Sequence, residues 1–306
     1  MNIPEAIRIV EIGPRDGFQS VGQWIPTEHK TAVVKMLLSA GVDFMEATSF
    51  ISPKAIEQMK DAPEVIESVK ACADMGRIYA LIPNFKGAER AYEAGVRQIS
   101  LVISASEVHN LNNVRRTPEE SLQELKIIRR ELPSLEVKLS LGTAFGCPFT
   151  GEVAEEKITF LIDGALDLGI TDIALCDTVG VADPLLVTRR LGLLRRRYAP
   201  RTVDWALHLH NTRGLASANA LAALTLGVDK FETAVGGLGG CPFAPGASGN
   251  LATEDLLFMA ARMNIATKVD IEAVIRAAEY IRDVAGIPID SKINAKTLQM
   301  APARRP

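Results

Sequence analysis

The sequence has no long hydrophobic run. No uninterrupted apolar stretch approaches the roughly 18 residues that a membrane-spanning helix requires. The N-terminus also lacks a charged segment followed by an apolar run, which is the pattern of a secretory signal peptide. We therefore expect a protein without a membrane partner, located in the cytoplasm.

Cysteine is scarce, with 4 residues among 306, and no two of them stand in Cys-x-x-Cys spacing. A chain of this length with 47% apolar residues can bury a large core without disulfide bonds. Reduced thiols are therefore the expected state of the cysteines.

A strong excess of basic charge is also absent, and the formal net charge is -3. The arginine clusters at 189–190 and 195–197 fall at helical spacing, which favours a solvated helix face. The composition thus predicts no nucleic-acid partner.

No Gly-x-Gly-x-x-Gly motif follows the first predicted strand, which argues against a dinucleotide-binding fold.

Short apolar runs alternate with amphipathic runs along most of the chain, and glycine or proline separates many of them. The predicted strands are Ile7–Ile12, Phe44–Thr48, Arg77–Ile82, Ile99–Ser104, Val137–Leu141, Ile173–Cys176, Trp205–His210 and Phe231–Val235. The predicted helices are Pro26–Ala40, Lys54–Ala71, Lys86–Glu93, Val153–Leu168 and Leu215–Leu226, with others beginning at Thr117, Asp183, Glu254 and Asp270.

Eight strand–helix units in one chain favour a closed parallel barrel over an open sheet. We predict an α/β fold, a (β/α)8 TIM barrel with additional C-terminal helices, as a single domain over residues 1–306. The barrel is expected at about 7–264 and a helical extension at about 265–306.

Three local patterns supplement this outline. The polar segment His109–Asn113 is expected to be a loop. Thr117 and Glu120, with a proline between them, form a predicted capping box at the start of a helix. The tail beyond Ile287 lacks further strand–helix units, and residues 302–306 are expected to fray.

Unusual polar residues lie near the ends of the predicted strands or in the segments that follow them. In a TIM barrel the catalytic residues gather at the carboxyl ends of the strands, so these side chains are expected to meet at one end of the barrel. They are Arg15, Asp16, Glu46, Asp177, His208, His210, Cys241 and Asn250.

His208 and His210 are the strongest candidates for binding a metal ion. Residues two apart in a strand point to the same side, so both imidazoles can bind one divalent ion. The alternative is that they are two half-exposed polar residues at a strand end. A carboxylate such as Asp16 and an amide oxygen such as Asn250 would complete a mixed set that favours Mg²⁺ or Mn²⁺ over structural zinc.

Arg15 and Cys241 suit two further catalytic roles. Arg15 keeps its proton and can stabilise a developing oxyanion, although a surface ion pair is the alternative. Cys241 lies in a glycine-rich loop that can reach a substrate, although most free cysteines are small buried residues.

Three stretches resemble the family of hydroxymethylglutaryl-CoA lyases, which belongs to a wider superfamily of metal-dependent barrel lyases. They are residues 10–19 (Val-Glu-Ile-Gly-Pro-Arg-Asp-Gly-Phe-Gln), residues 46–54 and the long run over residues 237–255. The last run separates these lyases from isopropylmalate and homocitrate synthases. The resemblance covers about residues 7–290.

The resemblance implies retro-Claisen cleavage of an acyl-CoA with a tertiary hydroxyl group, which is 3-hydroxy-3-methylglutaryl-CoA in the typical members. It implies an acyl-CoA substrate partner, a divalent metal cation (Mg²⁺ or Mn²⁺) as cofactor and a homodimer. The implied roles are metal binding by Asp16, His208, His210 and Asn250, enolate stabilisation by Arg15, proton donation by Cys241, ligand orientation or proton transfer by Glu46 and Asp177, and coenzyme contacts by Gln19 and Ser49.

Two segments depart from the family pattern. Residues 20–22 (Ser-Val-Gly) replace a polar and a cationic side chain, and Arg213 stands where a tyrosine is common. These changes leave open a related lyase that acts on citramalyl-CoA or on a longer 3-substituted glutaryl-CoA. A condensing synthase and a non-catalytic scaffold barrel are the remaining alternatives.

Overall fold

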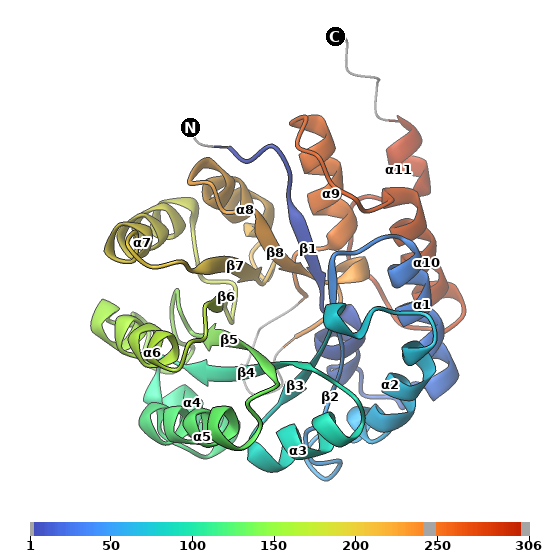
Figure 1. The fold of residues 1–306 in the computed structure, drawn as a ribbon. Helices are drawn as coiled ribbons and strands as arrows, with labels where there is room; N and C mark the ends of the chain where they lie inside the picture. The colour runs from blue at the N-terminus through green and yellow to red at the C-terminus, as the bar shows by residue number, and fades with distance from the viewer. Residues whose placement is uncertain (1–2, 241–248, 301–306) are drawn as a thin grey trace.

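The structure is a computed structural model, and it describes residues 3–240 and 249–300. In this part of the chain, parallel strands close into a barrel in the order β1 to β8, with β1 paired to both β2 and β8 (Figure 1). The strands are β1 (Arg8–Glu11), β2 (Phe44–Ser49), β3 (Ile78–Ile82), β4 (Gln98–Ser104), β5 (Glu136–Gly142), β6 (Asp172–Asp177), β7 (Asp204–Leu209) and β8 (Lys230–Thr233). The predicted TIM barrel is confirmed.

Helices form a ring around the barrel, as Figure 1 shows. They are α1 (Thr27–Ser39), α2 (Ala62–Lys70), α3 (Phe85–Glu93), α4 (Glu107–Val114), α5 (Pro118–Glu131), α6 (Glu155–Asp167), α7 (Pro184–Arg197), α8 (Ala216–Thr225), α9 (Thr253–Arg262), α10 (Ile271–Asp283) and α11 (Ala295–Met300). Short helical turns are η1 (Gly13–Gly17), η2 (Glu57–Met59), η3 (Met75–Arg77) and η4 (Val235–Gly237).

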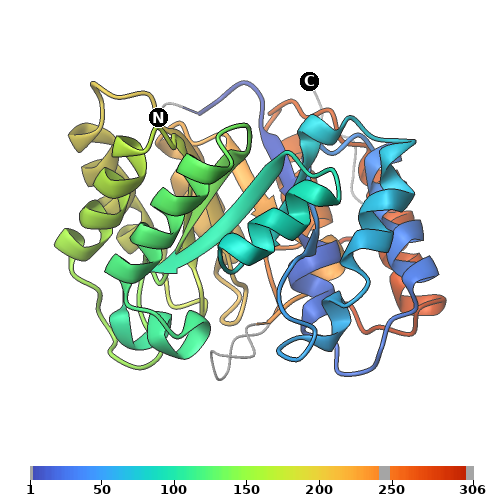
Figure 2. The same cartoon turned by 60° about the horizontal axis from the view of Figure 1, so that its bottom comes forward.

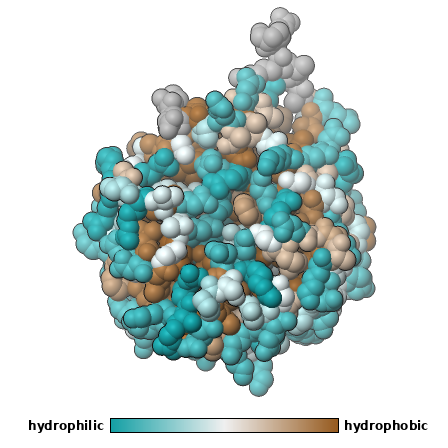
Figure 3. Space-filling view, in the orientation of Figure 1, coloured by the Kyte–Doolittle hydropathy of each residue, from teal (hydrophilic) through white to brown (hydrophobic). Residues whose placement is uncertain are grey.

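The core lies between the barrel and this ring. Strand residues such as Ile173 and Leu175 are fully buried, and α1 buries Val33 and Leu37 four residues apart on one face. The face shown in Figure 3 is mostly hydrophilic, with hydrophobic side chains scattered among polar ones. Within the described residues, no helix is both long and apolar enough to cross a membrane.

Two predictions of local secondary structure were wrong. The segment His109–Asn113 is not a loop, because it lies inside α4, whose start is capped by the Ser106 side chain. The predicted helix over residues 54–71 is the turn η2 followed by α2. A proline at the start of α2 lacks the amide hydrogen that a longer helix would need there.

Other local predictions agree with the structure. Thr117 and Glu120 form the capping box, with Thr117 Oγ1 accepting from the Glu120 amide at 3.1 Å. Beyond Ile287 the chain forms the short helix α11, whereas residues 302–306 lie outside the described residues. The boundary between barrel and extension near residue 264 stays a prediction.

Because all barrel pairs are parallel, the carboxyl ends of the strands share one end of the molecule. Figure 2 shows β4 pointing towards this end, where the short helix α4 lies. The opposite end is stabilised by ion pairs, in which Lys230 Nζ contacts Asp172 at 2.8 Å and Asp204 at 3.0 Å. The polar residues identified from the sequence that the structure describes lie towards the first end, whereas Cys241 is outside the described residues.

Candidate functional site

The turn after β1 positions Arg15 and Asp16. This turn is a π-helical segment, η1, and both residues are only 6% exposed. Gly13 opens it because a Cβ at that position would lie 2.8 Å from Glu11 Oε1. Glu11 accepts hydrogen bonds from the amides of Gly13 at 2.7 Å and Val235 at 2.9 Å, so it ties this turn to the segment after β8.

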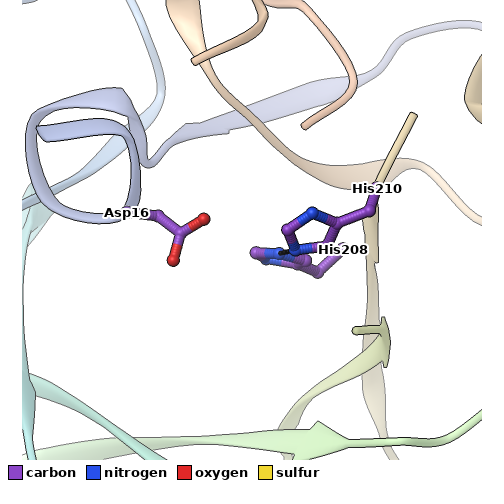
Figure 4. A group of neighbouring side chains, drawn as sticks. All are labelled: Asp16, His208 and His210. Atoms are coloured by element: carbon purple, nitrogen blue, oxygen red, sulfur yellow. Dashed lines mark hydrogen bonds between the residues drawn. The ribbon is translucent and has the colours of Figure 1, made fainter. Parts of the chain in front are cut away.

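The two histidines come from β7 and the residue after it, and they point to the same side. His208 Nε2 lies 3.2 Å from His210 Nε2, and both side chains are buried. Figure 4 shows the Asp16 carboxylate facing this pair of imidazoles. The two-residue spacing therefore has the consequence that the strand geometry predicts.

Asn250 reaches the same place through backbone pairing. It forms an isolated antiparallel bridge with His210, and its backbone N–H group donates to the Leu238 carbonyl at 3.3 Å. Its Nδ2 group donates to Asp16 Oδ2 at 2.7 Å. Gly239, with φ of +128°, leaves room for this contact, because a Cβ there would collide with the Asn250 amide.

These residues fit a divalent cation. One ligand atom from each of Asp16, His208 and His210 lies within 4.8 Å of the others. The buried Asn250 Oδ1 has no hydrogen-bond partner among the described residues, as a ligand atom would without its ion. The His208 and His210 Nε2 atoms cannot both carry a proton at their separation, but both can bind one ion. A possible metal site is therefore present.

The electrostatics keep the carboxylate of this site ionised. Burial alone raises the pKa of Asp16, but the positive charge of Arg15 and the neighbouring imidazoles lower it below its ordinary value. An ionised carboxylate is the form that binds a metal cation.

Glu232 on β8 and Lys138 on β5 also belong to the site, and both were missed in the sequence. Glu232 Oε2 lies 2.8 Å from His208 Nδ1, and its other oxygen accepts from Lys138 Nζ. Burial raises the pKa of Glu232, but Lys138 and His208 lower it well below its usual range. Glu232 therefore orients the ring of His208 and makes Nε2 a better ligand.

Arg15 is held by two carboxylates. Its Nε donates to Glu46 Oε2 and its Nη1 to Asp16 Oδ1, while Glu46 Oε1 accepts from the Ser100 hydroxyl. Burial lowers the pKa of Arg15, but Glu46 and Asp16 raise it above its ordinary value, so the guanidinium keeps its charge. A fixed cation of this kind can stabilise an oxyanion formed beside it.

The site opens into a cavity of about 110 Å³. Its lining includes polar and charged residues, among them Arg15, Asp16, His208 and His210, and apolar side chains such as Ile51. Such a cavity suits a ligand with a polar reacting group and an apolar portion.

The remaining candidates lie in different surroundings. Gln19 lines the cavity and donates to Asp16 Oδ1 at 3.0 Å. Ser49 Oγ accepts from the Ile51 amide at 3.2 Å, and Ser49 is not among the lining residues. Cys241 lies outside the described residues, so its predicted role stays a prediction.

Asp177 ends β6, as predicted, but does not line the cavity. Its carboxylate accepts hydrogen bonds from the amides of Val181 at 2.9 Å and Ala182 at 3.1 Å, and it thereby shapes the turn after β6. Burial raises the pKa of Asp177 to about 6, although these amides oppose the shift. Its part in proton transfer stays a prediction.

Comparisons with known proteins agree with this geometry. The chain is 39% identical over 295 residues to the hydroxymethylglutaryl-CoA lyase YngG of Bacillus subtilis (strain 168), covering 95% of this chain and 97% of that protein. It is 36% identical to the (R)-citramalyl-CoA lyase of Chloroflexus aurantiacus, covering 94% of each.

Solved structures give the same result. The structure of an HMG-CoA lyase from Acinetobacter baumannii in complex with coenzyme A and 3-methylmalate matches with a TM-score of 0.88 and 39% identity, covering 94% of each chain. The B. subtilis HMG-CoA lyase matches with a TM-score of 0.90 and 38% identity, covering 98% of this chain and 99% of that one. The sequence model of the HMGL-like family matches residues 6–281, and the chain belongs to this family.

Proposed function

We propose that this protein is a divalent-metal-dependent carbon–carbon lyase that cleaves 3-hydroxy-3-methylglutaryl-CoA to acetyl-CoA and acetoacetate. The observation that carries the proposal is the buried group of Asp16, His208 and His210 at the carboxyl end of the barrel, with Arg15 beside it. The similarity to hydroxymethylglutaryl-CoA lyases over nearly the whole chain supports the choice of reaction.

Asp16, His208, His210 and Asn250 would hold the cation through one carboxylate oxygen, two imidazole nitrogens and one amide oxygen. This mixed set without thiolates favours Mg²⁺ or Mn²⁺ over structural zinc. Such an ion lowers the pKa of an alcohol bound to it, as it does for bound water. The substrate hydroxyl group would thus lose its proton more readily.

Cleavage requires that the substrate hydroxyl group loses its proton and that one carbon–carbon bond breaks. A carboxylate, Glu46 or Asp177, accepts the hydroxyl proton directly or through other groups, and the oxygen forms the new ketone carbonyl. The bond between the thioester α-carbon and the hydroxyl-bearing carbon breaks, and its electron pair stays on the α-carbon as an enolate. Arg15 stabilises the negative charge on the enolate oxygen. Cys241 then donates a proton to the α-carbon, which yields acetyl-CoA.

Exclusion of water is the second requirement, because bulk water would protonate the enolate prematurely. An apolar wall that includes Ile51, Leu81 and Val102 supports this role, since these side chains line the same cavity as the charged residues. We infer that the acyl group displaces water from this wall when it binds.

The acyl-CoA partner is supported by the A. baumannii relative, whose structure contains coenzyme A. Gln19 and Ser49 would contact the coenzyme, and Gln19 is the better placed of the two because it lines the cavity. The homodimer and the cytoplasmic location stay predictions.

A specific observation favours keeping citramalyl-CoA as a second substrate. The C. aurantiacus relative is named for that activity and is 36% identical to this chain.

The residues that depart from the family pattern shape turns near the site. Arg213 donates to the carbonyls of Val179 and Gly180 at 3.0 Å, so it fixes the turn after β6. The Ser20 hydroxyl donates to the Gly17 carbonyl at 2.7 Å, so it closes the turn after η1.

The test is a coupled assay of acetyl-CoA release with Mg²⁺ or Mn²⁺, run with 3-hydroxy-3-methylglutaryl-CoA and, in parallel, with citramalyl-CoA. Turnover of the first substrate supports the proposal. Turnover of citramalyl-CoA alone would assign the second function, and no turnover of either with metal bound would contradict both.

A further inference from the structure

The helix α4 carries a buried histidine that the proposed chemistry does not use. His109 is only 1% exposed, yet it lines the same cavity as Arg15 and the metal-site histidines. Asn113, one turn further along α4, also lines this cavity. One face of α4 is therefore part of the wall of the site.

Only one of the two ring nitrogens of His109 has a hydrogen-bond partner among the described residues. Its Nδ1 atom lies 2.7 Å from the hydroxyl oxygen of Ser104, at the end of β4. Its Nε2 atom is buried and has no hydrogen-bond partner among the described residues. A buried polar atom of this kind is rare in proteins, and a bound ligand is one way to satisfy it.

The partner of Nδ1 indicates which nitrogen carries the proton. Ser104 is fully buried, and its hydroxyl hydrogen has no other acceptor among the described residues. The hydroxyl group therefore donates to Nδ1, and the single proton of a neutral imidazole must lie on Nε2. Burial lowers the pKa of His109, which agrees with a neutral ring.

The position of this ring is fixed from several sides. Ser106 caps α4, and the Asn110 side chain accepts from the Ser104 amide at 2.8 Å and donates to the Arg116 carbonyl at 2.8 Å. The ring of Phe149 lies against His109, with 6.1 Å between ring centroids. The Nε2–H group is thus held in place before any ligand binds.

We propose that the Nε2–H group of His109 donates a hydrogen bond to an uncharged carbonyl oxygen of the bound acyl-CoA, either the thioester carbonyl or an amide carbonyl of the pantetheine arm. This inference rests on the proposed function, because it assumes an acyl-CoA ligand. A neutral donor matches an uncharged acceptor, whereas the charged Arg15 matches an oxyanion. His109 is therefore a substrate-binding residue on the wall formed by α4.

The test compares two variants. His109→Phe removes the donor and retains an aromatic ring next to Phe149, whereas His109→Gln retains an N–H group near the position of Nε2. We expect His109→Phe to raise KM for the acyl-CoA about tenfold to hundredfold, the effect of losing one buried hydrogen bond, and His109→Gln to recover most of it. The metal concentration for half-maximal activity should not change. His29→Phe, on α1, is the matched control.

Product inhibition distinguishes the two carbonyl sources. If the thioester carbonyl is the acceptor, His109→Phe weakens inhibition by acetyl-CoA but leaves inhibition by free coenzyme A unchanged. If a pantetheine amide is the acceptor, inhibition by both weakens to the same extent.

Two results, one kinetic and one spectroscopic, would each overturn the inference. KM and both inhibition constants within twofold of wild type in a folded His109→Phe protein would overturn it, as would an Nδ1–H tautomer of His109 in nitrogen NMR spectra of labelled histidine. If the wild-type protein turns over no acyl-CoA, the proposed function fails first. The NMR tautomer and binding of acetyl-CoA then still test His109 independently.

Discussion

Glu232 decides how well His208 can bind a cation, because its carboxylate lies 2.8 Å from His208 Nδ1. Replacing Glu232 by glutamine keeps an acceptor there but removes the negative charge. We expect the affinity for Mn²⁺ to fall about tenfold to hundredfold, as for other groups that orient a metal ligand. Isothermal titration with Mn²⁺ measures this.

The control for that measurement is Glu64→Gln, which removes an exposed carboxylate on α2. Its Mn²⁺ affinity should equal that of wild type. An unchanged affinity in Glu232→Gln as well would mean that Glu232 does not act on the metal site.

At the scale of single residues, the sequence identifies several site residues near the carboxyl ends of strands but misses two others on strands. Asp16, His208 and His210 were predicted from their positions at strand ends, and the structure brings them together. Lys138 and Glu232 lie within β5 and β8, where a single sequence does not show which side of the strand is buried. Their contact joins residues far apart in the chain, so only the closed barrel reveals it.

Helix α5 offers a test at the scale of a secondary-structure element. Thr117 Oγ1 accepts a hydrogen bond from the backbone N–H group of Glu120 at 3.1 Å, which satisfies a donor at the start of the helix. Thr117→Ala should lower the free energy of unfolding by about 1 kcal/mol, measured by urea denaturation.

The matched control is Thr188→Ala, an exposed position inside α7 whose hydroxyl donates to the Pro184 carbonyl. Because alanine is a better helix former than threonine, this variant should be as stable as wild type or slightly more stable. Equal losses in both variants would show that the cap contributes nothing specific.

Elements with strong local signals were predictable, and those fixed by tertiary contacts were not. The strands and the capping box follow from apolar runs and end signals in the sequence. The sequence of α4 contains several asparagines, which favour loops, but Asn110 bonds to Ser121 and to the backbone near both ends of the helix. These contacts from neighbouring elements stabilise a helix that local preference opposes.

For the whole molecule, two buried carboxyl groups make stability depend on pH. Burial raises the pKa of Glu11 to about 7 and that of Glu254 to about 8, and hydrogen bonds from neighbouring groups only partly oppose this. In the unfolded chain a glutamate titrates near pH 4.3. Between these values the folded state binds more protons than the unfolded state.

Stability should therefore fall as pH rises from about 5 to 8, by at most about 1.4 kcal/mol per pH unit for each group. Glu254→Gln removes one titrating group, and its amide oxygen can still accept from the Gly236 amide. Urea denaturation at several pH values should give a shallower decline for this variant than for wild type. Parallel curves would show that Glu254 keeps its ordinary pKa.

The barrel itself was predictable because eight strand–helix units in one chain leave few other arrangements. Its closure also explains the site, since β1 pairs with β8 although the two strands lie near opposite ends of the chain, and β8 pairs with β7. The approach of Asn250 was harder to predict, because it depends on a backbone bridge to His210 after a glycine-rich segment. The sequence marked Asn250 as a candidate ligand from its place after the eighth strand, but it did not show this backbone pairing.

The central claim is that the cation held by Asp16, His208 and His210 is required for carbon–carbon cleavage. The most direct measurement is acetyl-CoA release from 3-hydroxy-3-methylglutaryl-CoA by metal-stripped protein as Mn²⁺ is added back, for wild type and Asp16→Asn. We predict no release without metal, saturable recovery in wild type, and at least a tenfold weaker response in the variant. Full release by the stripped protein, or an identical Mn²⁺ response in Asp16→Asn, would contradict the claim.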